Sequence, residues 1–473
     1  MNILYVAAEA APFIKTGGLA DVAGSLPLSI KKLGHDIRVV LPLHGTIKQE
    51  YKDKMKKIGE YYVDLNWRSQ YVGIMTLKLN NVVFYFLDNE YYFNREHPYG
   101  EFDDGERYAY FSKAVTMLPK EIDFKPHVIH SNDWHSALVN LFVHEFEKGD
   151  KYYSDIKKVF TIHNLKYQGI FSPSVLGEIM GVSDEYLSED SIKYYDSINY
   201  MKAGIVYSDA ITTVSKSYAD EIKYGFFGEG LEGVLSYHSH KLTGIINGID
   251  YDVFNPKKDP NIVYNYDYTN VKDKYKNKRE LQKTYKLPQK KNIPIISIVS
   301  RLVDMKGIDL ISHVIDELMQ LDIQIIVLGT GDEKYEELFK HFQDRYPSKL
   351  SANIYFSETE AHKIYAGSDI FLMPSMIEPC GLSQLISLRY GTVPIVREVG
   401  GLKDTVIPYN KYTNEGNGFT FKNYNAHELL FKIKEAVDIY KKDKKTWESM
   451  IVRGMKSDNS WEHSSKEYIE LYK

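Results

Sequence analysis

The sequence predicts an α/β protein built from two doubly wound, Rossmann-like domains that face each other across a cleft. Short apolar runs of strand length alternate with segments of helical periodicity, which is typical of parallel sheets with crossover helices. The alternation stops at the polar stretch 257–291 and then starts again. A chain of 473 residues also exceeds what one hydrophobic core ordinarily organises. We therefore place a hinge near residues 247–256, where Asn-Gly and Asn-Pro turn signals occur.

Composition excludes several classes of partner. The 59 Lys and Arg residues and the 64 Asp and Glu residues leave a net charge of −5, so the chain shows no basic footprint for nucleic acid or an anionic membrane. A single cysteine, Cys380, excludes an internal disulfide framework. We find neither a signal-peptide pattern nor an apolar run of membrane-spanning length. We expect a cytoplasmic protein, or a plastid protein if a transit peptide has been removed.

The first strand and the loop after it are the centre of the first domain. The apolar run at residues 2–9 predicts a buried strand, and apolar positions from Leu19 to Leu33 predict a helix that faces the sheet. Between them, residues 15–22 read Lys-Thr-Gly-Gly-Leu-Ala-Asp-Val. Glycine lets a backbone approach a ligand closely, and the amides that open a helix attract an anion, to which Lys15 adds a positive charge. The same spacing also suits a tight turn with a solvated lysine, and it is not a dinucleotide fingerprint.

The remaining elements of the first domain follow from apolar runs and turn signals. A helix stop at residues 33–35 precedes the second strand, so the first two strands form a parallel pair. The further elements expected are strands at 37–43, 61–65, 71–79, 82–87, 128–130, 160–162 and 210–215, a turn at Asn80-Asn81 and a helix at 107–118.

Two histidines follow the carboxyl ends of strands in the first domain. The strand at 128–130 continues into Ser-Asn-Asp-Trp-His, which ends at His135, and the strand at 160–162 is followed by His163 and Asn164. Ligands of open α/β sheets bind beside the carboxyl ends of the strands, so His135 should face the same crevice as Lys15. A single histidine is more often structural, but two of them at adjacent strand ends favour a functional site.

The second series of strands and helices repeats this arrangement. A buried strand at 293–299 leads into a loop that carries Arg301 and Lys306, ahead of a helix at 308–320. A strand at 370–374 leads into Ser-Met-Ile-Glu-Pro-Cys-Gly-Leu-Ser at 375–383. The other elements expected are strands at 324–331 and 393–396, a glycine-bearing loop at 400–404 and a helix near 278–285.

Motifs spread along the chain resemble those of the glycogen and starch synthase family, the glycosyltransferases that extend α-1,4-glucans from a nucleoside diphosphate glucose. They occur in order over nearly the whole chain, and together they are highly specific. They are the 15–22 motif, Asn-Asp-Trp-His at 132–135, Thr-Ile-His-Asn-Leu-x-Tyr-Gln-Gly at 161–169, Asn-Gly-Ile-Asp at 247–250, Ser-Arg-Leu at 300–302, Lys306-Gly307, Glu-Pro-Cys-Gly-Leu at 378–382 and Gly-Gly-Leu-x-Asp-Thr-Val at 400–406.

The resemblance implies two Rossmann-like domains of the GT-B type with the active site between them. The implied parts are an acceptor-side domain at 1–246, a nucleotide-sugar-binding domain at 247–455 and a terminal helix at 456–473 that packs back on the first domain. The implied donor is ADP-glucose, and the acceptor is the non-reducing end of an α-1,4-glucan primer, either glycogen or a maltooligosaccharide. In the family the α-anomeric configuration is retained, and neither a metal nor another cofactor is required.

The resemblance also assigns roles to particular residues. The catalytic candidates are His135, Arg301, Lys306 and Glu378. The donor-binding candidates are Lys15, Gly18, Asn247, Tyr355, Phe356, Cys380, Gly381, Leu382 and Ser383, and the acceptor-binding candidates are Asp21, His163 and Asn164. Cations and backbone amides suit a leaving diphosphate, because preorganised positive charge lowers the barrier in a site that excludes water. Glu378 would hold glucose hydroxyls or stabilise positive charge on the sugar ring, and Phe356, or else Tyr355, would stack on the base.

Three positions depart from the family pattern. Ile386 stands where related glycosyltransferases often have a second glutamate, which favours front-face displacement assisted by the leaving phosphate. Met305 replaces a usual polar residue, and Pro-Leu-His at 42–44 replaces Pro-Lys-Tyr. Two other functions stay open, a related glycosyltransferase that uses another nucleotide sugar such as UDP-glucose and an inactive α-glucan-binding relative.

Overall fold

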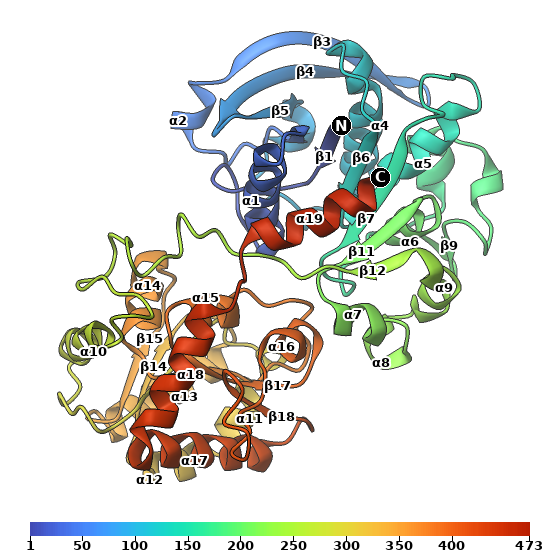
Figure 1. Ribbon diagram of the computed structural model, residues 1–473. Helices are drawn as coiled ribbons and strands as arrows, with labels where there is room; N and C mark the ends of the chain where they lie inside the picture. Colours follow the sequence, from blue (N-terminus) through green and yellow to red (C-terminus); the bar gives the residue numbers. More distant parts are fainter. The chain divides into compact units, whose positions relative to one another are not determined.

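The computed structural model describes all residues from Met1 to Lys473, and they form two units with separate sheets. The first unit contains Met1–Asn247 and returns at the chain end with Trp461–Lys473, whereas the second contains Gly248–Ser460 (Figure 1). Asn247, expected as the first residue of the second domain, belongs to the first unit.

A nine-stranded sheet organises the first unit, in the order β12-β11-β7-β6-β1-β2-β5-β4-β3. The strands from β12 to β5 pair in parallel, whereas β3 and β4 form antiparallel pairs at one edge. Its strands are β1 (Asn2–Val6), β2 (Asp36–Pro42), β3 (Lys56–Leu65), β4 (Arg68–Leu79), β5 (Val82–Asp88), β6 (Val128–Asn132), β7 (Lys157–Ile162), β11 (Ala210–Thr213) and β12 (Leu242–Gly244). A small second sheet contains β8 (Ile170–Phe171), β9 (Lys193–Tyr194) and β10 (Ser197–Asn199).

The turns of the β3–β4–β5 edge use asparagines in the left-handed backbone region. Asn66, with φ 57°, lies between β3 and β4, and Asn80 and Asn81, with φ 47° and 66°, lie between β4 and β5. Asparagine tolerates this region better than most residues, so the expected turn at Asn80-Asn81 is confirmed. The expected strands at 61–65 and 71–79 are parts of the longer β3 and β4.

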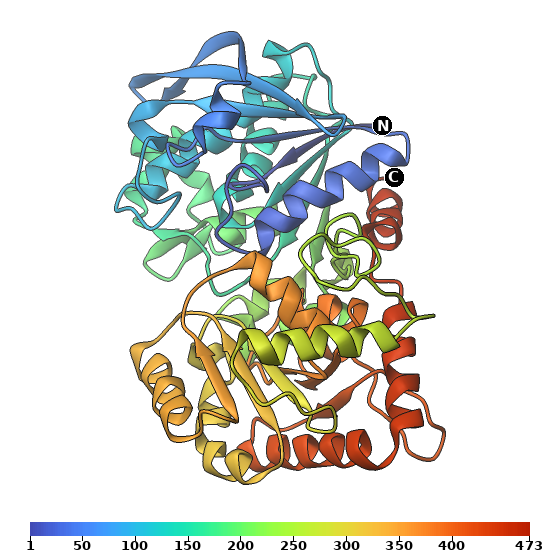
Figure 2. The ribbon, with the colours of Figure 1, turned by 90° about the vertical axis from the view of Figure 1, so that its left-hand side faces the viewer.

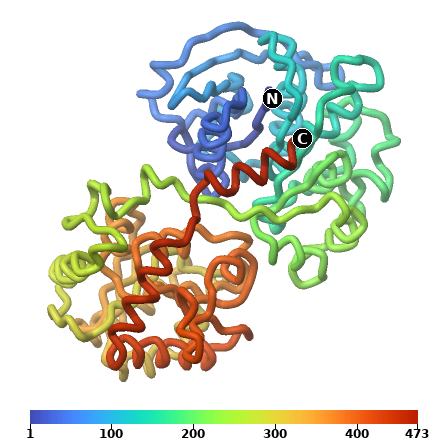
Figure 3. The backbone as a smooth tube through the Cα atoms, viewed as in Figure 1, coloured from blue at the N-terminus to red at the C-terminus, as the bar shows by residue number.

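The helices of the first unit are α1 (Gly18–Lys32), α2 (Gln49–Lys52), α3 (Glu90–Phe93), α4 (Asp104–Glu121), α5 (Trp134–Glu147), α6 (Tyr200–Val206), α7 (Lys216–Glu221), α8 (Gly225–Gly228), α9 (Glu232–Tyr237) and α19 (Trp461–Tyr472). Apolar side chains of β1, α1 and α19 share one buried cluster, which includes Ile3, Tyr5, Val22, Leu26, Ile30, Trp461, Tyr468 and Ile469. The terminal helix lies beside the N-terminal helix in the chain trace (Figure 3). This burial fixes β1 and the loop that follows it.

The terminal helix begins later than expected. The helix expected over 456–473 starts at Trp461, because residues 444–456 belong to the separate helix α18. Asp458 Oδ1 accepts hydrogen bonds from the backbone nitrogen of Ser460 at 3.0 Å and from its hydroxyl at 2.6 Å. Such local side-chain bonds compete with helical bonds, so the two helices stay separate.

Six parallel strands form the sheet of the second unit, in the order β15-β14-β13-β16-β17-β18. They are β13 (Ile295–Val299), β14 (Gln324–Leu328), β15 (Leu350–Asn353), β16 (Ile370–Met373), β17 (Val393–Arg397) and β18 (Phe419–Phe421). The helices are α10 (Lys272–Thr284), α11 (Ile308–His313), α12 (Ile315–Gln320), α13 (Glu333–Arg345), α14 (Glu358–Gly367), α15 (Ser383–Arg389), α16 (Gly400–Thr405), α17 (Ala426–Lys442) and α18 (Lys444–Lys456). None of the helices in the chain combines the length and apolarity that crossing a bilayer requires.

Two helices of the second unit differ from expectation. The single helix expected at 308–320 is divided at Val314, whose φ of −114° and ψ of 15° separate α11 from α12. The helix expected near 278–285 is the longer α10, which packs against α14 (Figure 2). Its buried positions include Lys274 and Lys278, so a search for apolar periodicity misses its first turns. The Lys278 ammonium pairs with Asp369 at 2.7 Å in the interior.

Candidate active site

A buried carboxylate organises the loop between β1 and α1. The side chain of Glu9 accepts hydrogen bonds from the Thr16 backbone nitrogen at 2.6 Å and from the Thr16 hydroxyl at 2.5 Å. Burial raises the pKa of Glu9, and hydrogen bonds from Thr16 and from the amides of Ala20 and Gly17 oppose that shift. The loop is therefore held from inside, while its outer side remains available to a ligand.

The outer side of this loop presents a lysine beside an aspartate. Lys15 Nζ lies 2.8 Å from Asp21 Oδ1, and both side chains are partly exposed. Gly18 is the first residue of α1, and no atom lies within 4 Å of the position that a Cβ would take there. A ligand can approach the helix N-terminus closely at this point.

His135 lies in an aromatic cage within the first turn of α5. Its ring centroid is 4.7 Å from that of Tyr99, 4.9 Å from that of Tyr108 and 4.0 Å from that of Trp134. The residue is only 6% exposed, yet neither ring nitrogen has a hydrogen-bond partner. Burial, with smaller effects from His44 and Arg107, lowers the pKa of His135 to about 3. The ring is neutral at physiological pH and offers one donor and one acceptor to a ligand.

Asp133 determines where α5 starts. Its backbone has φ 54° and ψ 178°, a region that costs a residue other than glycine about 1–3 kcal/mol. Its Oδ1 accepts hydrogen bonds from the backbone nitrogens of His163 at 2.7 Å and Asn164 at 3.4 Å. Burial raises the pKa of Asp133 to about 7. Asp133 thus joins the end of β7 to the start of the helix that carries His135.

His163 and Asn164 take part in local hydrogen bonds. The Nε2 atom of His163 lies 2.9 Å from Asn132 Oδ1, and burial lowers the pKa of His163 to about 3. Asn164 Oδ1 accepts a hydrogen bond from the Lys166 backbone nitrogen at 3.1 Å. Further along the first unit, Asn247 is buried and its side-chain oxygen has no hydrogen-bond partner. Of the two candidate asparagines, Asn247 is therefore the one whose side-chain oxygen has no partner within the protein and can accept a hydrogen bond from a ligand.

An ion pair forms the centre of the candidate site in the second unit. Lys306 Nζ lies 2.6 Å from Glu378 Oε2, and the Ser375 hydroxyl donates to the same oxygen at 3.0 Å. Lys306 follows β13 and Glu378 follows β16, which are neighbouring strands of the sheet. Both side chains are largely buried, at 19% and 9% exposure. Since both contacts use Oε2, the second carboxylate oxygen is left for a ligand.

Glycines allow the loop that carries Lys306 and the loop that carries Glu378 to approach each other closely. Gly307 has φ 73°, and a Cβ there would lie 2.2 Å from the carbonyl oxygen of Pro374. The Met376 backbone nitrogen donates to the Met305 carbonyl at 3.0 Å, which joins the loops directly. Gly400 has φ 45°, and a Cβ there would lie 2.1 Å from the Glu378 carbonyl oxygen. These close approaches position Lys306 and Glu378.

A small hollow of about 110 Å³ lies beside the ion pair, and its lining includes Arg301, Lys306, Ser375 and Ser383. Arg301 is exposed, whereas Ser383 opens α15 and is half-buried. Gly381 has φ 74° and precedes Leu382, the residue that caps α15. Cys380 is buried. In the segment that follows Glu378, the Ser383 hydroxyl therefore lines the hollow, whereas the Cys380 thiol is buried in the interior.

The two aromatic candidates lie on the segment after β15. Phe356 is 79% exposed, as expected of a ring that is free to stack on a base. Tyr355 is 42% exposed, and its hydroxyl donates to Glu360 Oε2 at 2.8 Å. Tyr355 is held by this bond, so Phe356 is the freer of the two rings.

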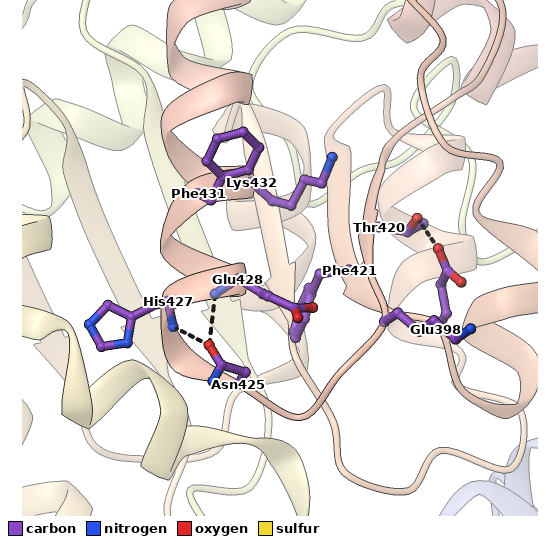
Figure 4. Close-up of a pocket in the computed structure, with 9 residues that line it drawn as sticks. Glu398, Thr420, Phe421, Asn425, His427, Glu428, Phe431 and Lys432 are labelled. Atoms are coloured by element: carbon purple, nitrogen blue, oxygen red, sulfur yellow. Dashed lines mark hydrogen bonds between the residues drawn. The ribbon is translucent and has the colours of Figure 1, made fainter.

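A larger hollow of about 530 Å³ lies elsewhere on the second unit, between β18 and α17. Its lining includes Glu398, Thr420, Phe421, Asn425, His427, Glu428 and Phe431 (Figure 4). None of the candidate site residues lines it. Across the chain, no group of three or more His, Cys, Asp or Glu side chains is arranged to hold a metal ion.

Both halves of the chain match known families. Residues 2–237 match the family described as "Starch synthase catalytic domain", and residues 277–450 match "Glycosyl transferases group 1". The glycogen synthase of Finegoldia magna is 54% identical, covering 100% of this chain and 99% of that protein. The glycogen synthase of Clostridium novyi is 53% identical, covering 100% and 98%. The chain belongs to the glycogen and starch synthase family.

Solved structures agree with this assignment to the family. The catalytic domain of starch synthase IV from Arabidopsis thaliana, bound to ADP and acarbose, matches with a TM-score of 0.91 and 31% identity, covering 100% of this chain and 98% of that chain. A sucrose-phosphate synthase from Thermosynechococcus elongatus has a TM-score of 0.62 at 15% identity, which supports the fold alone. This family member is a glycosyltransferase with two Rossmann-like domains of the GT-B type.

Sequence reasoning did not single out three residues that shape the site in this family member, namely Glu9, Tyr99 and Asp133. Glu9 ends the first apolar run, and a carboxylate at the end of a buried strand is a signal that the sequence did carry. The hydroxyls of Tyr99 and Thr16 are hydrogen-bonded, which joins the aromatic cage to the loop at 15–22. Tyr99 follows no motif, so only the folded chain shows its role.

Proposed function

We propose that this enzyme transfers the glucosyl group of ADP-glucose to the non-reducing end of an α-1,4-glucan, either glycogen or a maltooligosaccharide, with retention of the α-configuration. The observation that carries the proposal is the ion pair of Lys306 and Glu378 at the carboxyl ends of β13 and β16. Family membership supports a nucleotide sugar and a glucan as substrates. The ADP bound to the Arabidopsis relative supports adenine as the donor base.

In this proposal the first unit serves the acceptor and the second binds the nucleotide sugar. Lys306 and Arg301 offset the charge of the diphosphate, together with Lys15 and the amides of Gly18, Gly381 and Leu382. Ser383 donates its hydroxyl to a phosphate oxygen, and Phe356 stacks on the base. Asp21, His163 and Asn164 lie on the acceptor side. Cys380 packs next to the phosphates rather than reacting.

Glu378 and His135 act on the glucosyl group. The Oε1 atom of Glu378 holds a sugar hydroxyl and stabilises positive charge as the glycosidic bond to phosphate weakens, while Lys306 anchors Oε2. The neutral ring of His135 meets the 6-hydroxyl or the reacting face of the sugar. Asn247 has an unpartnered side-chain oxygen that can accept another hydroxyl.

The reaction step is front-face displacement. The bond from the anomeric carbon to the ADP oxygen breaks, and the acceptor oxygen forms its bond to the same face. The acceptor proton passes to the leaving phosphate, so ADP and a glucan longer by one glucosyl unit are formed. The buried apolar side chain of Ile386 leaves no carboxylate nucleophile at that position for a double-displacement mechanism.

The test is nucleotide release from ADP-glucose and, separately, UDP-glucose, with a maltooligosaccharide primer and EDTA present. We expect ADP release accompanied by primer lengthening. Release from UDP-glucose alone contradicts the proposed donor, and loss of activity in EDTA contradicts the metal-independent reaction. Absence of release with either donor contradicts the proposed reaction as a whole.

A further inference from the structure

Two chain segments have to stay together for Lys306 to meet Glu378. The first is the turn Asp304–Lys306, and the second is the loop after β16 that carries Ser375, Met376 and Glu378. One direct backbone hydrogen bond joins them, from Met376 to Met305. A further connection runs through the segment between β18 and α17, which none of the family motifs described above includes.

Tyr424 contacts the first of these segments. Its hydroxyl donates to Asp309 Oδ1 at 2.5 Å and lies 3.2 Å from the carbonyl oxygen of Asp304. The same carbonyl accepts the backbone hydrogen bond of Gly307 at 2.8 Å, which closes the turn that ends in Lys306. The Asp304 carbonyl oxygen is therefore contacted both by the Tyr424 hydroxyl and by the backbone nitrogen of Gly307, and both contacts stabilise the turn.

Arg397 contacts the second segment. Its Nε donates to the Ser375 carbonyl oxygen at 3.0 Å, and its Nη2 donates to the Met376 carbonyl oxygen. The Arg397 guanidinium carbon lies 5.6 Å from the centroid of the Tyr424 ring, within the range of a cation–π interaction. Tyr424 and Arg397 together thus connect the two segments at a place distinct from the ion pair.

The position of Tyr424 is itself fixed by its neighbours in sequence. Asn423 donates to Glu428 through its backbone nitrogen at 3.0 Å and through its side-chain nitrogen at 2.6 Å. Asn425 Oδ1 caps α17 by accepting hydrogen bonds from the backbone nitrogens of His427 at 2.9 Å and Glu428 at 3.0 Å (Figure 4). Tyr424 therefore projects from a segment that hydrogen bonds hold on both sides of it.

We propose that Tyr424, acting with Arg397, is a positioning residue for catalysis. It keeps the turn that carries Lys306 and the loop that carries Glu378 in a fixed position relative to each other. This inference rests on the proposed function, because Lys306 and Glu378 act on the nucleotide sugar only if that function holds. A shift of about 1 Å in a charged group costs substantial transition-state stabilisation. Tyr424 acts through Lys306 and need not touch the substrate.

The experiment uses the full chain with Tyr424→Phe, which keeps the ring beside Arg397 and removes the hydroxyl. Tyr266→Phe is the matched control, since its hydroxyl donates to a backbone carbonyl, that of Tyr390 at 2.6 Å, in the same unit. We expect Tyr424→Phe to lower kcat about tenfold with less than a twofold change in KM. Amide hydrogen exchange at residues 303–308 and 375–378 should become faster in Tyr424→Phe and stay at the wild-type rate in Tyr266→Phe.

A double-mutant cycle separates positioning from a general loss of stability. In a Lys306→Ala background, Tyr424→Phe should lower turnover less than twofold, because the group that it positions is gone. A full additional tenfold loss in that background overturns the proposal, and so does wild-type kcat or wild-type exchange in Tyr424→Phe itself. If Tyr424→Phe does not fold, Arg397→Lys is judged by the same measurements. A wild-type enzyme without turnover contradicts the proposed function. The comparison of amide hydrogen exchange in Tyr424→Phe and Tyr266→Phe would still test whether Tyr424 positions the two segments.

Discussion

Lys306 and Glu378 are separated by 72 positions in the sequence, yet their side chains form an ion pair. Each could be predicted as a site residue because it follows a buried strand and lies in a family motif. The ion pair could not be predicted, because it depends on how closely two loops cross. The same holds for His135, whose unpartnered ring nitrogens are a property of the cage around it.

At this scale we predict that Lys306→Ala lowers turnover by about two orders of magnitude or more, the cost of losing a charged transition-state contact. Glu378→Ala should do the same, since it also leaves the Lys306 charge largely buried without its partner. Steady-state nucleotide release with a saturating primer measures both. Lys340→Ala is the control, because this exposed lysine pairs only with Glu337 on α13. Turnover near wild type in either variant contradicts the role proposed for that residue.

A second residue-scale prediction concerns Glu9. Glu9→Ala removes the carboxylate that accepts hydrogen bonds from the backbone nitrogen and the hydroxyl of Thr16, which costs about 1–3 kcal/mol and loosens the loop that carries Lys15. We expect a raised KM for the donor, together with a lower melting temperature. Donor titrations and thermal unfolding measure the two effects. The exposed Glu50 on α2 serves as the control in Glu50→Ala, and an unchanged donor KM in Glu9→Ala speaks against the loop as a donor contact.

At the scale of elements, glycines decide how closely loops and strands approach. The sequence indicated glycine-bearing strand exits, but not which neighbour each glycine meets. Gly329 shows the reason, since a Cβ there would lie 1.9 Å from the Ser300 carbonyl oxygen. A Cβ on Gly331 would likewise lie 2.2 Å from the Leu302 carbonyl oxygen. These two glycines support the loop that carries Arg301.

We predict that Gly307→Ala lowers both stability and turnover. The added Cβ would collide with the Pro374 carbonyl, and a φ of 73° is strained for alanine by about 1–2 kcal/mol. The two loops must then separate, which moves Lys306 away from Glu378. Thermal unfolding and kcat measure the outcome. Gly233→Ala within α9 is the comparison, because nothing lies within 4 Å of a Cβ there, and this change should be neutral or slightly stabilising. Equal effects of the two substitutions would contradict the role of the loop crossing.

At the scale of the whole molecule, the first unit holds five histidines in the neutral state. Burial is the main cause in each case, and it lowers the pKa values of His44 and His238 to about 4 and those of His130, His135 and His163 to about 3. In the unfolded chain these rings titrate near 6.5. Below that pH the unfolded state binds more protons than the folded state, so acidification favours unfolding. Asp133 opposes this effect, since its raised pKa lets the folded state bind a proton first.

We therefore predict that the free energy of unfolding falls as the pH is lowered from 6.5 to 4.5. Each neutral histidine contributes up to about 1.4 kcal/mol per pH unit. His44→Gln should show a shallower decrease than the wild type, because one of the five rings is removed. Urea unfolding at several pH values gives both slopes. Identical slopes in the two proteins, or a wild type that becomes more stable in acid, would contradict this account.

The sequence by itself determined the alternation of strands and helices, the two domains, the family and the residues that follow the strand ends. These are local properties, since periodicity, turn residues and motifs occupy contiguous segments of the chain. Only the tertiary structure decided the partners, including the Lys306–Glu378 pair, the cage around His135 and the contact of Tyr424 with the Lys306 turn. The physical reason is that each of these contacts joins segments distant in sequence, and close packing rather than local propensity determines their distance.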